Sequence, residues 1–465
     1  MNSTEIPSET PVKTRAAAPR GQLYKAFWRW HFYAGLFVIP FLFILALSGM
    51  LMLLSKPIEQ GLYKDLLQVT PADNGLSTSQ QLERVQNAYP DSRISLYIPP
   101  RDNTESARFS LVSASDGGGH SGHGAPSTTV YVNPYTGEIL GELNPANTPY
   151  AKVKNLHGTL YMGNAGDALI EIAAGLAILM LLTGIYLTWP DTGWRSVLPV
   201  RSLKKRADWR RLHGFIGLLV AIPLLFFLLS GLSWTNVWGG KLVQAWSSLP
   251  GTSFEAPAAA DTHDSMNQHG LHQVPWALEQ TPMPSSTHEH AGTDLGNLDI
   301  DDVIKIAANN GLKDFRVHLS AGHKTVWTLS STTIAGDTLN PSSERTLHID
   351  RNTGEILADI RFSDYPVMGM AMAAFIPLHQ GDLGLWNLLL NLLLCLLIIV
   401  MIVCGFVLWF KRVHNAQHKL VAPPAADRPV SRAVVIGMLV AALCFPLSAL
   451  AIGATVLVHR IYRLF

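Results

Sequence analysis

The stretch Trp30-His31-Phe32-Tyr33-Ala34-Gly35 opens a long apolar run, and Leu212-His213-Gly214-Phe215-Ile216-Gly217 opens another that reads almost the same. Counted from the histidine, glycine recurs at the fourth position in both runs. Ser-Gly then recurs at the seventeenth and eighteenth positions, as Ser48-Gly49 and Ser230-Gly231. Two histidines at matched positions of an internal repeat indicate a pair that holds a ligand between them.

The composition is that of a membrane protein with sizeable polar parts. Hydrophobic residues make up 48% of the chain and charged residues 15%, which is a low charge content for a globular protein. A bilayer core of about 30 Å needs about 20 apolar residues per helix. Five runs reach that length, at 32–54, 168–189, 215–238, 386–410 and 433–458. The sequence therefore predicts an α-helical membrane protein with five transmembrane helices.

The distribution of basic residues predicts the orientation. Lys and Arg are concentrated in the connector between the second and third runs, in the N-terminal segment and after the fourth run. Cytoplasmic loops are enriched in these residues, so we expect a cytoplasmic N-terminus and two exported loops that face the periplasm or the exterior. The three cysteines, Cys395, Cys404 and Cys444, all lie in membrane runs, so the loops contain no disulfide. A net charge of +1 gives no indication of nucleic-acid binding.

The repeat extends through the exported loops and indicates a duplication. Val130-Tyr131-Val132-Asn133-Pro134-Tyr135-Thr136-Gly137-Glu138-Ile139-Leu140 in the first loop resembles Leu347-His348-Ile349-Asp350-Arg351-Asn352-Thr353-Gly354-Glu355-Ile356-Leu357 in the second. Each stretch reads as strand, Gly turn and strand, which predicts a β-hairpin. Helix-like stretches precede both hairpins, so we expect two small exported α+β domains.

The predicted order of segments is helix, exported domain and helix. This unit occurs twice, and one further helix follows it. The segments are an N-terminal tail 1–27, helices 28–54, 156–190, 212–238, 378–411 and 433–458, exported domains 55–155 and 239–377, and cytoplasmic loops 191–211 and 412–432. Residues 256–296 of the second exported domain are rich in Pro, Ala, His and Thr without periodicity, which is typical of a flexible insertion.

A second histidine pair follows the exported domains, with His157 before the second helix and His379 before the fourth. By the predicted orientation, His31 and His213 lie at the cytoplasmic face, and His157 and His379 at the exported face. Imidazole is a common axial ligand of haem iron, and helix bundles build cofactor sites from facing side chains. The pattern predicts two haem b groups, one per pair, with irons about 20 Å apart across the membrane.

The positions of these four histidines allow two other interpretations. Histidines from consecutive helices could pair instead, but partners at opposite membrane faces cannot reach one iron. Histidines at a membrane interface can also be amphipathic anchors that bind nothing. Ionisable groups in membrane segments are functional candidates by default, and four at repeat-related positions favour the cofactor interpretation.

Further histidines gather in the exported loops and are weaker metal candidates. They are His120, His123, His263, His269, His272, His288 and His290, with Met266 and Met283 nearby. Mixed His and Met sets can bind copper or iron weakly, although low-complexity loops of this composition often bind nothing specific.

The Trp28–Gly35 run, the Leu-His elements before the second and fourth helices, and the Thr-Gly-Glu-Ile-Leu hairpins together resemble the PepSY-associated transmembrane family, from about Phe27 to Arg412. Members of this family are iron-regulated inner-membrane proteins of Gram-negative bacteria, and some are haem-containing reductases that release iron from ferric siderophores in the periplasm. The resemblance implies that the exported domains are PepSY domains and that the four histidines correspond to the family's recurring ones. The His-rich insertions and the fifth helix depart from the family minimum, which leaves copper or another metal centre open as the substrate.

The leading hypothesis is a di-haem b reductase that moves electrons from a cytoplasmic reductase or quinol to an exported acceptor, ferric iron in a siderophore. One alternative is a haem-free, membrane-anchored PepSY protein that binds or regulates a peptidase. A second alternative is a copper or iron transporter. The sequence contains no Gly-rich phosphate loop and no dinucleotide fingerprint, so nicotinamide and flavin are not expected to bind to this chain.

Overall fold

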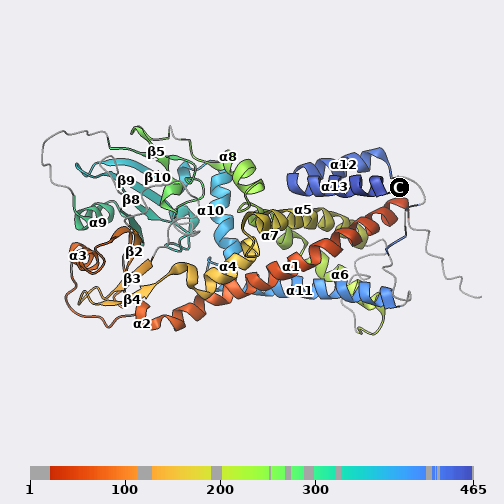
Figure 1. Cartoon of the computed structure of the whole chain (residues 1–465), viewed down its shortest axis with the longest axis horizontal. Coiled ribbons are helices and arrows are strands. Elements are labelled where there is room, and N and C mark those ends of the chain that lie inside the picture. The colour runs from red at the N-terminus through yellow and green to blue at the C-terminus, as the bar shows by residue number, and fades with distance from the viewer. Residues whose placement is uncertain are drawn as a thin grey trace, which may run out of the picture.

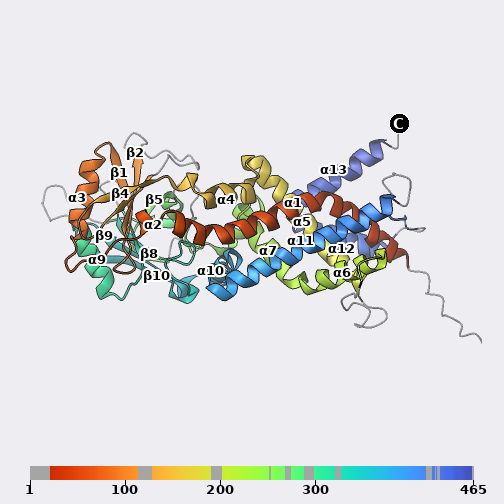
Figure 2. The ribbon, with the colours of Figure 1, turned by 90° about the horizontal axis from the view of Figure 1, so that it is seen from below.

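A computed structural model describes residues 21–113, 128–189, 202–250, 253–267, 274–286, 298–319, 326–414, 422–424, 426 and 430–462. The molecule is elongated, with a β-sheet and its covering helices at one end and a bundle of long helices at the other (Figure 1). Helix α1 (Gln22–Leu62) runs through the bundle to the sheet, as both ribbon views show (Figures 1 and 2). We call the two ends of the bundle the sheet end and the far end.

Three helices of the described residues are long and apolar enough to cross a membrane. They are α1, α5 (Gly163–Thr188) and α11 (Leu385–His414). The helices α6 (Arg206–Leu219) and α7 (Ala221–Leu232) form a fourth span if they are counted together, although the chain bends by 59° between them. Pro223 explains the bend, because proline has no N–H to donate to the carbonyl four residues earlier and its ring clashes with that carbonyl.

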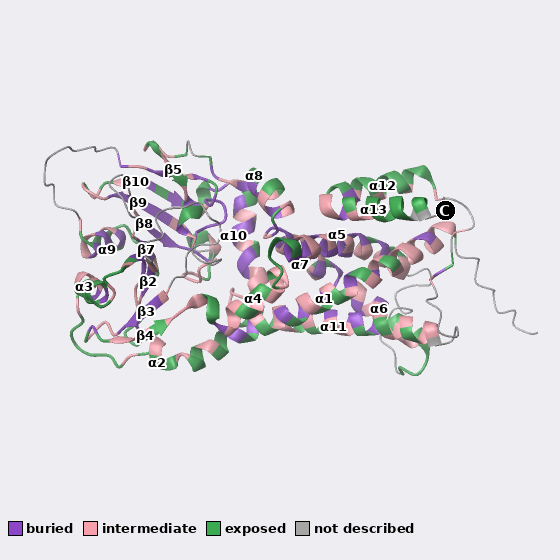
Figure 3. Ribbon diagram, viewed as in Figure 1, coloured by how far each residue is buried: buried purple, intermediate pink, exposed green. Residues whose placement is uncertain are grey.

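The predicted fifth helix, residues 433–458, does not form one continuous span. Helix α12 (Arg432–Leu443) ends first, and α13 (Pro446–Tyr462) begins with a proline two residues after Cys444. Proline disfavours helical backbone at the residue before it and suits the first turn of a helix, so the apolar run is divided here. Both helices expose most of one side (Figure 3), while Ser448 of α13 donates a hydrogen bond of 3.0 Å to a carbonyl of α5.

The two exported segments predicted as separate domains share one antiparallel sheet in the order β10-β9-β8-β7-β1-β2-β3-β4. The strands are β1 (Ser92–Ile98), β2 (Ala107–Ser113), β3 (Thr128–Val132), β4 (Ile139–Leu143), β7 (Arg316–His318), β8 (Val326–Ser331), β9 (Arg345–Asp350) and β10 (Ile356–Arg361). Each segment contributes four strands, and the two sets join where Tyr97 of β1 pairs with Val317 of β7. This pairing covers an edge strand of each segment, and uncovered edges would leave backbone N–H and C=O groups without partners.

One hydrophobic core unites the two halves of the sheet. Helices α3 (Thr78–Ala88) and α9 (Ile300–Asn309) pack their buried Val85 and Val303 against Phe109 and Leu347 from the two sets of strands. The two helices are also tied together at their starts, because Asp301 accepts hydrogen bonds from the backbone N–H groups of Thr78 and Ser79 at 2.8 and 3.1 Å.

Both predicted hairpins are confirmed, as β3-β4 and β9-β10. Gly137 and Gly354 occupy matching positions in the two turns, with φ of 71° and 74°. This left-handed backbone costs glycine little and other residues more, which explains the repeated Thr-Gly-Glu sequence.

Two short helices lead the chain from the sheet back into the bundle. They are α4 (Pro149–Thr159) before α5, and α10 (Val367–Gln380) before α11. The His-rich insertion forms a small second sheet of β5 (Ala258–Thr262) and β6 (Pro282–Pro284). Its Leu278 packs in a cluster with Val326 and Ile360 of the large sheet, so the described part of the insertion is fastened to β8 and β10.

Candidate functional site

The four repeat-related histidines lie on four different helices. His31 is near the start of α1, His213 is on α6, and His157 and His379 are near the ends of α4 and α10. His31 and His213 form what we call the far-end pair, and His157 and His379 form the sheet-end pair. Each histidine is anchored by a helix of its own half of the repeat, whereas each pair combines one histidine from each half.

In the far-end pair, both imidazoles are held through Nδ1. His31 Nδ1 lies 3.0 Å from the carbonyl oxygen of Met180 on α5, and His213 Nδ1 lies 2.9 Å from that of Met401 on α11. A carbonyl oxygen can only accept a hydrogen bond, so Nδ1 carries the proton in both rings. Nε2 of each neutral ring therefore keeps its lone pair.

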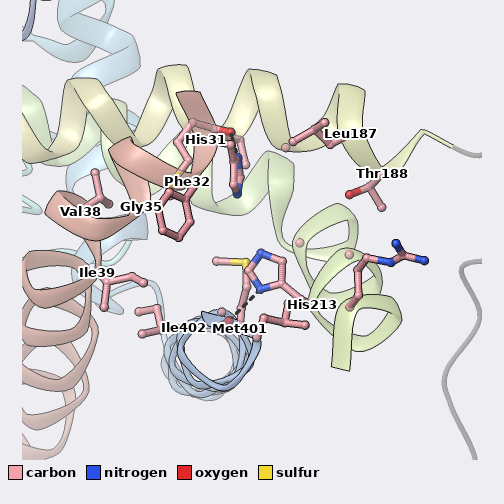
Figure 4. Close-up of a pocket in the computed structure, with 18 of the residues that line it drawn as sticks. His31, Phe32, Gly35, Val38, Ile39, Leu187, Thr188, His213, Met401 and Ile402 are labelled. Atoms are coloured by element: carbon pink, nitrogen blue, oxygen red, sulfur yellow. Dashed lines mark hydrogen bonds between the residues drawn. The ribbon is translucent and has the colours of Figure 1, made fainter. Parts of the chain in front are cut away.

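The two rings of the far-end pair face one another. Their centroids are 6.3 Å apart and their planes cross at 87°, and a nitrogen of each ring is turned toward the other ring (Figure 4). Two imidazoles that bind one metal ion from opposite sides, through bonds of about 2 Å, have centroids about 6 Å apart. The spacing of the two rings would therefore let both histidines bind one metal ion.

In the sheet-end pair, serines replace the carbonyls. His157 Nδ1 lies 2.9 Å from Ser48 Oγ, and His379 Nδ1 lies 2.8 Å from Ser230 Oγ. Each serine hydroxyl also donates to a carbonyl one turn earlier in its own helix, so its oxygen is free to accept from the histidine. The same tautomer results, with the lone pair on Nε2.

A glycine lies against Cε1 of every one of the four histidines. A Cβ atom built at Gly184 would lie 3.0 Å from Cε1 of His31, at Gly49 3.4 Å from His157, and at Gly231 or Gly405 3.5 Å from His379 or His213. Three of the four follow a Ser or Thr that bonds to the same histidine. Each ring therefore lies in a notch made by a small residue and a glycine on a facing helix.

A cavity of about 280 Å³ adjoins the far-end pair. Both histidines line it, together with apolar side chains of α1, α5, α6 and α11 and the glycines Gly35 and Gly217. Three cations, Arg206, Arg210 and Arg412, also line it, and the Arg412 guanidinium lies 5.0 Å from the ring centroid of Trp28. An apolar cavity with basic groups suits a flat apolar molecule that carries carboxylates.

Sequence reasoning missed two residues that fix the sheet-end pair. Asn387 and Asn391 are buried in the apolar helix α11. Asn391 Nδ2 donates to the carbonyls of Leu378 and His379 at 2.8 and 3.1 Å, and Asn387 Nδ2 donates to the former at 3.0 Å. They hold the end of α10 where His379 lies. Two asparagines four residues apart on one face of a membrane helix were the available signal.

Of the weaker metal candidates, only His263 lies within the described residues. It is fully buried, with Nε2 3.0 Å from His348 Nε2 and Nδ1 2.7 Å from the carbonyl of Thr281. Burial lowers the pKa of His263 to about 4 and that of His348 well below its usual value, so both are neutral and bond the insertion to β9. His120, His123, His269, His272, His288 and His290 lie outside the described residues. Within the described ranges, no group of three or more His, Cys, Asp or Glu side chains is suited to a metal ion.

The comparison with known proteins identifies the chain's family. No curated protein matches the chain. A family model described as the PepSY-associated TM region matches residues 28–412, which covers both histidine pairs, both halves of the sheet, all of α5 and most of α1 and α11. The chain is therefore a membrane protein that belongs to the PepSY-associated TM region family.

Proposed function

We propose that the protein is a di-haem b reductase of the bacterial inner membrane, with its sheet end in the periplasm. The observation that carries the proposal is the common geometry of the four histidines. Every Nδ1–H is bonded to a fixed acceptor, every Nε2 keeps its lone pair, and the far-end rings are spaced so that both would reach one iron. A hydrogen bond that fixes the tautomer and orientation of a ligating histidine is a common feature of metal sites.

The chain supplies suitable surroundings for the cofactor at the far end. His31 and His213 would ligate one haem iron, and His157 and His379 the other. Apolar side chains and five glycines line the far-end cavity, and Arg206, Arg210 and Arg412 would pair with the haem carboxylates. A bound haem supplies an iron that gains and loses one electron at a time.

The two pairs are arranged along the length of the bundle. Ser48, which anchors the sheet-end pair, follows His31 by 17 residues in α1. At a rise of 1.5 Å per residue, the two pairs are about 25 Å apart along the helix axis. Electrons would enter from a quinol or a cytoplasmic reductase and leave to a periplasmic ferric complex. The divalent ion binds hard oxygen ligands less strongly than the trivalent one because its charge is lower, so reduction would release iron from a siderophore.

Absorbance spectroscopy and redox titration of the purified full-length protein test this function. We expect a Soret band, about two haems per chain and two separable reduction potentials. A protein without haem, or a Soret band that survives alanine at all four histidines, would contradict the proposal and favour the regulatory alternative.

Enlarging the glycine that contacts His31 should have a smaller effect than removing the histidines. In Gly184→Val, the added side chain meets the His31 ring, because even a Cβ would stand 3.0 Å from Cε1. We expect the far-end haem to be partly lost or its potential shifted, with the sheet-end haem unchanged. Gly437→Val is the matched control, since a Cβ there meets no atom within 4 Å. Identical spectra and potentials for the two variants would show that the notch does not position His31.

A further inference from the structure

A second cavity, of about 620 Å³, lies where the sheet end of α1 meets the sheet. Its volume is within the range of small-molecule sites, about 300–1,000 Å³. None of the four histidines lines it. Its lining includes three cations, three carboxylates and three tyrosines.

Two helices and an ion pair connect the cavity to the sheet-end pair. Lys56 follows Ser48 by eight residues in α1, and Tyr150 precedes His157 by seven residues in α4, which places the lining about 10–12 Å along these helices from the pair. Lys56 also forms an ion pair with Asp382, three residues after His379. A ligand in the cavity would therefore lie close to the outer end of the proposed electron path.

The carboxylates of the lining accept hydrogen bonds from backbone N–H groups around the cavity. Glu59 accepts from the backbone N–H of Tyr150 at 2.6 Å, and Asp102 accepts from that of Thr104 at 2.7 Å. Glu105 accepts from the backbone N–H of Arg101 at 3.3 Å. These hydrogen bonds account for the three acidic groups without any ligand.

Arg108 on β2 is the least exposed cation of the lining, with 22% of its side chain exposed against 44% for Lys56. Lys56 has its ion pair with Asp382, and Arg101 Nη2 donates to the carbonyl of Gly336 at 2.9 Å. The guanidinium of Arg108 has Glu105 as its carboxylate partner, at 3.7 Å. Burial lowers the pKa of Arg108, but an arginine stays charged, so an anionic partner in the cavity would be favoured.

We propose that this cavity binds the electron acceptor, an oxygen-rich anionic chelate of ferric iron. This inference rests on the proposed function and assigns the site of its substrate. The donors of a guanidinium match paired oxygen atoms, and the rings of Tyr63, Tyr131 and Tyr150 offer flat surfaces to the organic part of a chelate.

The proposed reduction of iron in this cavity balances in atoms and electrons. One electron converts Fe(III) to Fe(II) in the chelate, and no covalent bond of the chelator is made or broken. If a quinol is the donor, its oxidation to the quinone releases two electrons and two protons, and it reduces two chelates.

The test separates binding from reduction. Binding of the redox-inert, anionic gallium complex of citrate to the full-length protein is measured by calorimetry, and reoxidation of the reduced protein by the ferric complex of citrate is followed by absorbance. Arg108→Gln removes the cation. Gln60→Trp fills the cavity from an exposed position of α1. Arg93→Gln is the matched control, because Arg93 lies on the neighbouring strand β1 outside the cavity.

We expect Kd for the gallium complex and KM for the ferric complex to rise about tenfold in Arg108→Gln and Gln60→Trp, with haem content and kcat unchanged. Arg93→Gln should match the wild type. Equal affinity in all four proteins would overturn the assignment of this cavity while leaving the haem proposal intact. A protein without haem that still bound the gallium complex in this pattern would overturn the proposed function and leave the binding site standing.

Discussion

Alanine at His213 is expected to remove one of the two haems and leave the other. The far-end haem would lose one of its two histidine ligands, and His31 alone would hold the iron weakly. The haem content should fall from about two per chain to about one, and of the two potentials only that of the sheet-end haem should remain. Pyridine haemochrome assay and redox titration of the purified variant measure both quantities.

Met401→Leu is the control for this variant. Met401 holds His213 through its backbone carbonyl, and leucine has nearly the same volume as methionine, so this variant should retain both haems. External imidazole added to a His213→Gly variant should restore part of the lost absorbance. Two haems with unchanged potentials in the alanine variant would rule out His213 as a ligand.

Alanine at His379 should separate reduction of the protein from reduction of its acceptor. The proposed far-end haem would not depend on this residue and should still be reduced by the donor. The sheet-end haem would be lost, which leaves a gap of about 25 Å between the far-end pair and the sheet end. Reoxidation by a ferric chelate should therefore slow by about a hundredfold or more, a loss of about 2.7 kcal/mol in transition-state stabilisation. Stopped-flow absorbance measures the rate.

Phe375→Leu on the same helix is the matched control. Phe375 is 43% exposed and contacts the ring of Phe226 rather than a histidine, so its replacement should leave the rate within about twofold of the wild type. Fast reoxidation of the His379 variant would mean that electrons leave the protein by another route.

The sequence predicted those features that repeat along the chain. Gly137 and Gly354 mark turns whose backbone requires a positive φ, so both hairpins could be predicted from local sequence. The apolar runs from His31 and before Trp409 are long enough to form continuous helices, and they do so in α1 and α11. By contrast, Pro223 lies at the bend of one predicted span and Pro446 begins a new helix in another. Because α1 continues through Pro40, a proline in an apolar run does not by itself predict a break.

The sequence by itself determined the chain's family, its membrane character and the four histidines, since these follow from residue types at repeated spacings. Only the tertiary structure decided that β1 and β7 join the two exported segments into one sheet, because strand pairing between distant segments leaves no local signal. It also decided which groups anchor the histidines. Ser48, Ser230 and the carbonyls of Met180 and Met401 meet their partners across more than 100 residues, and only packing of the helices brings such groups within hydrogen-bond distance.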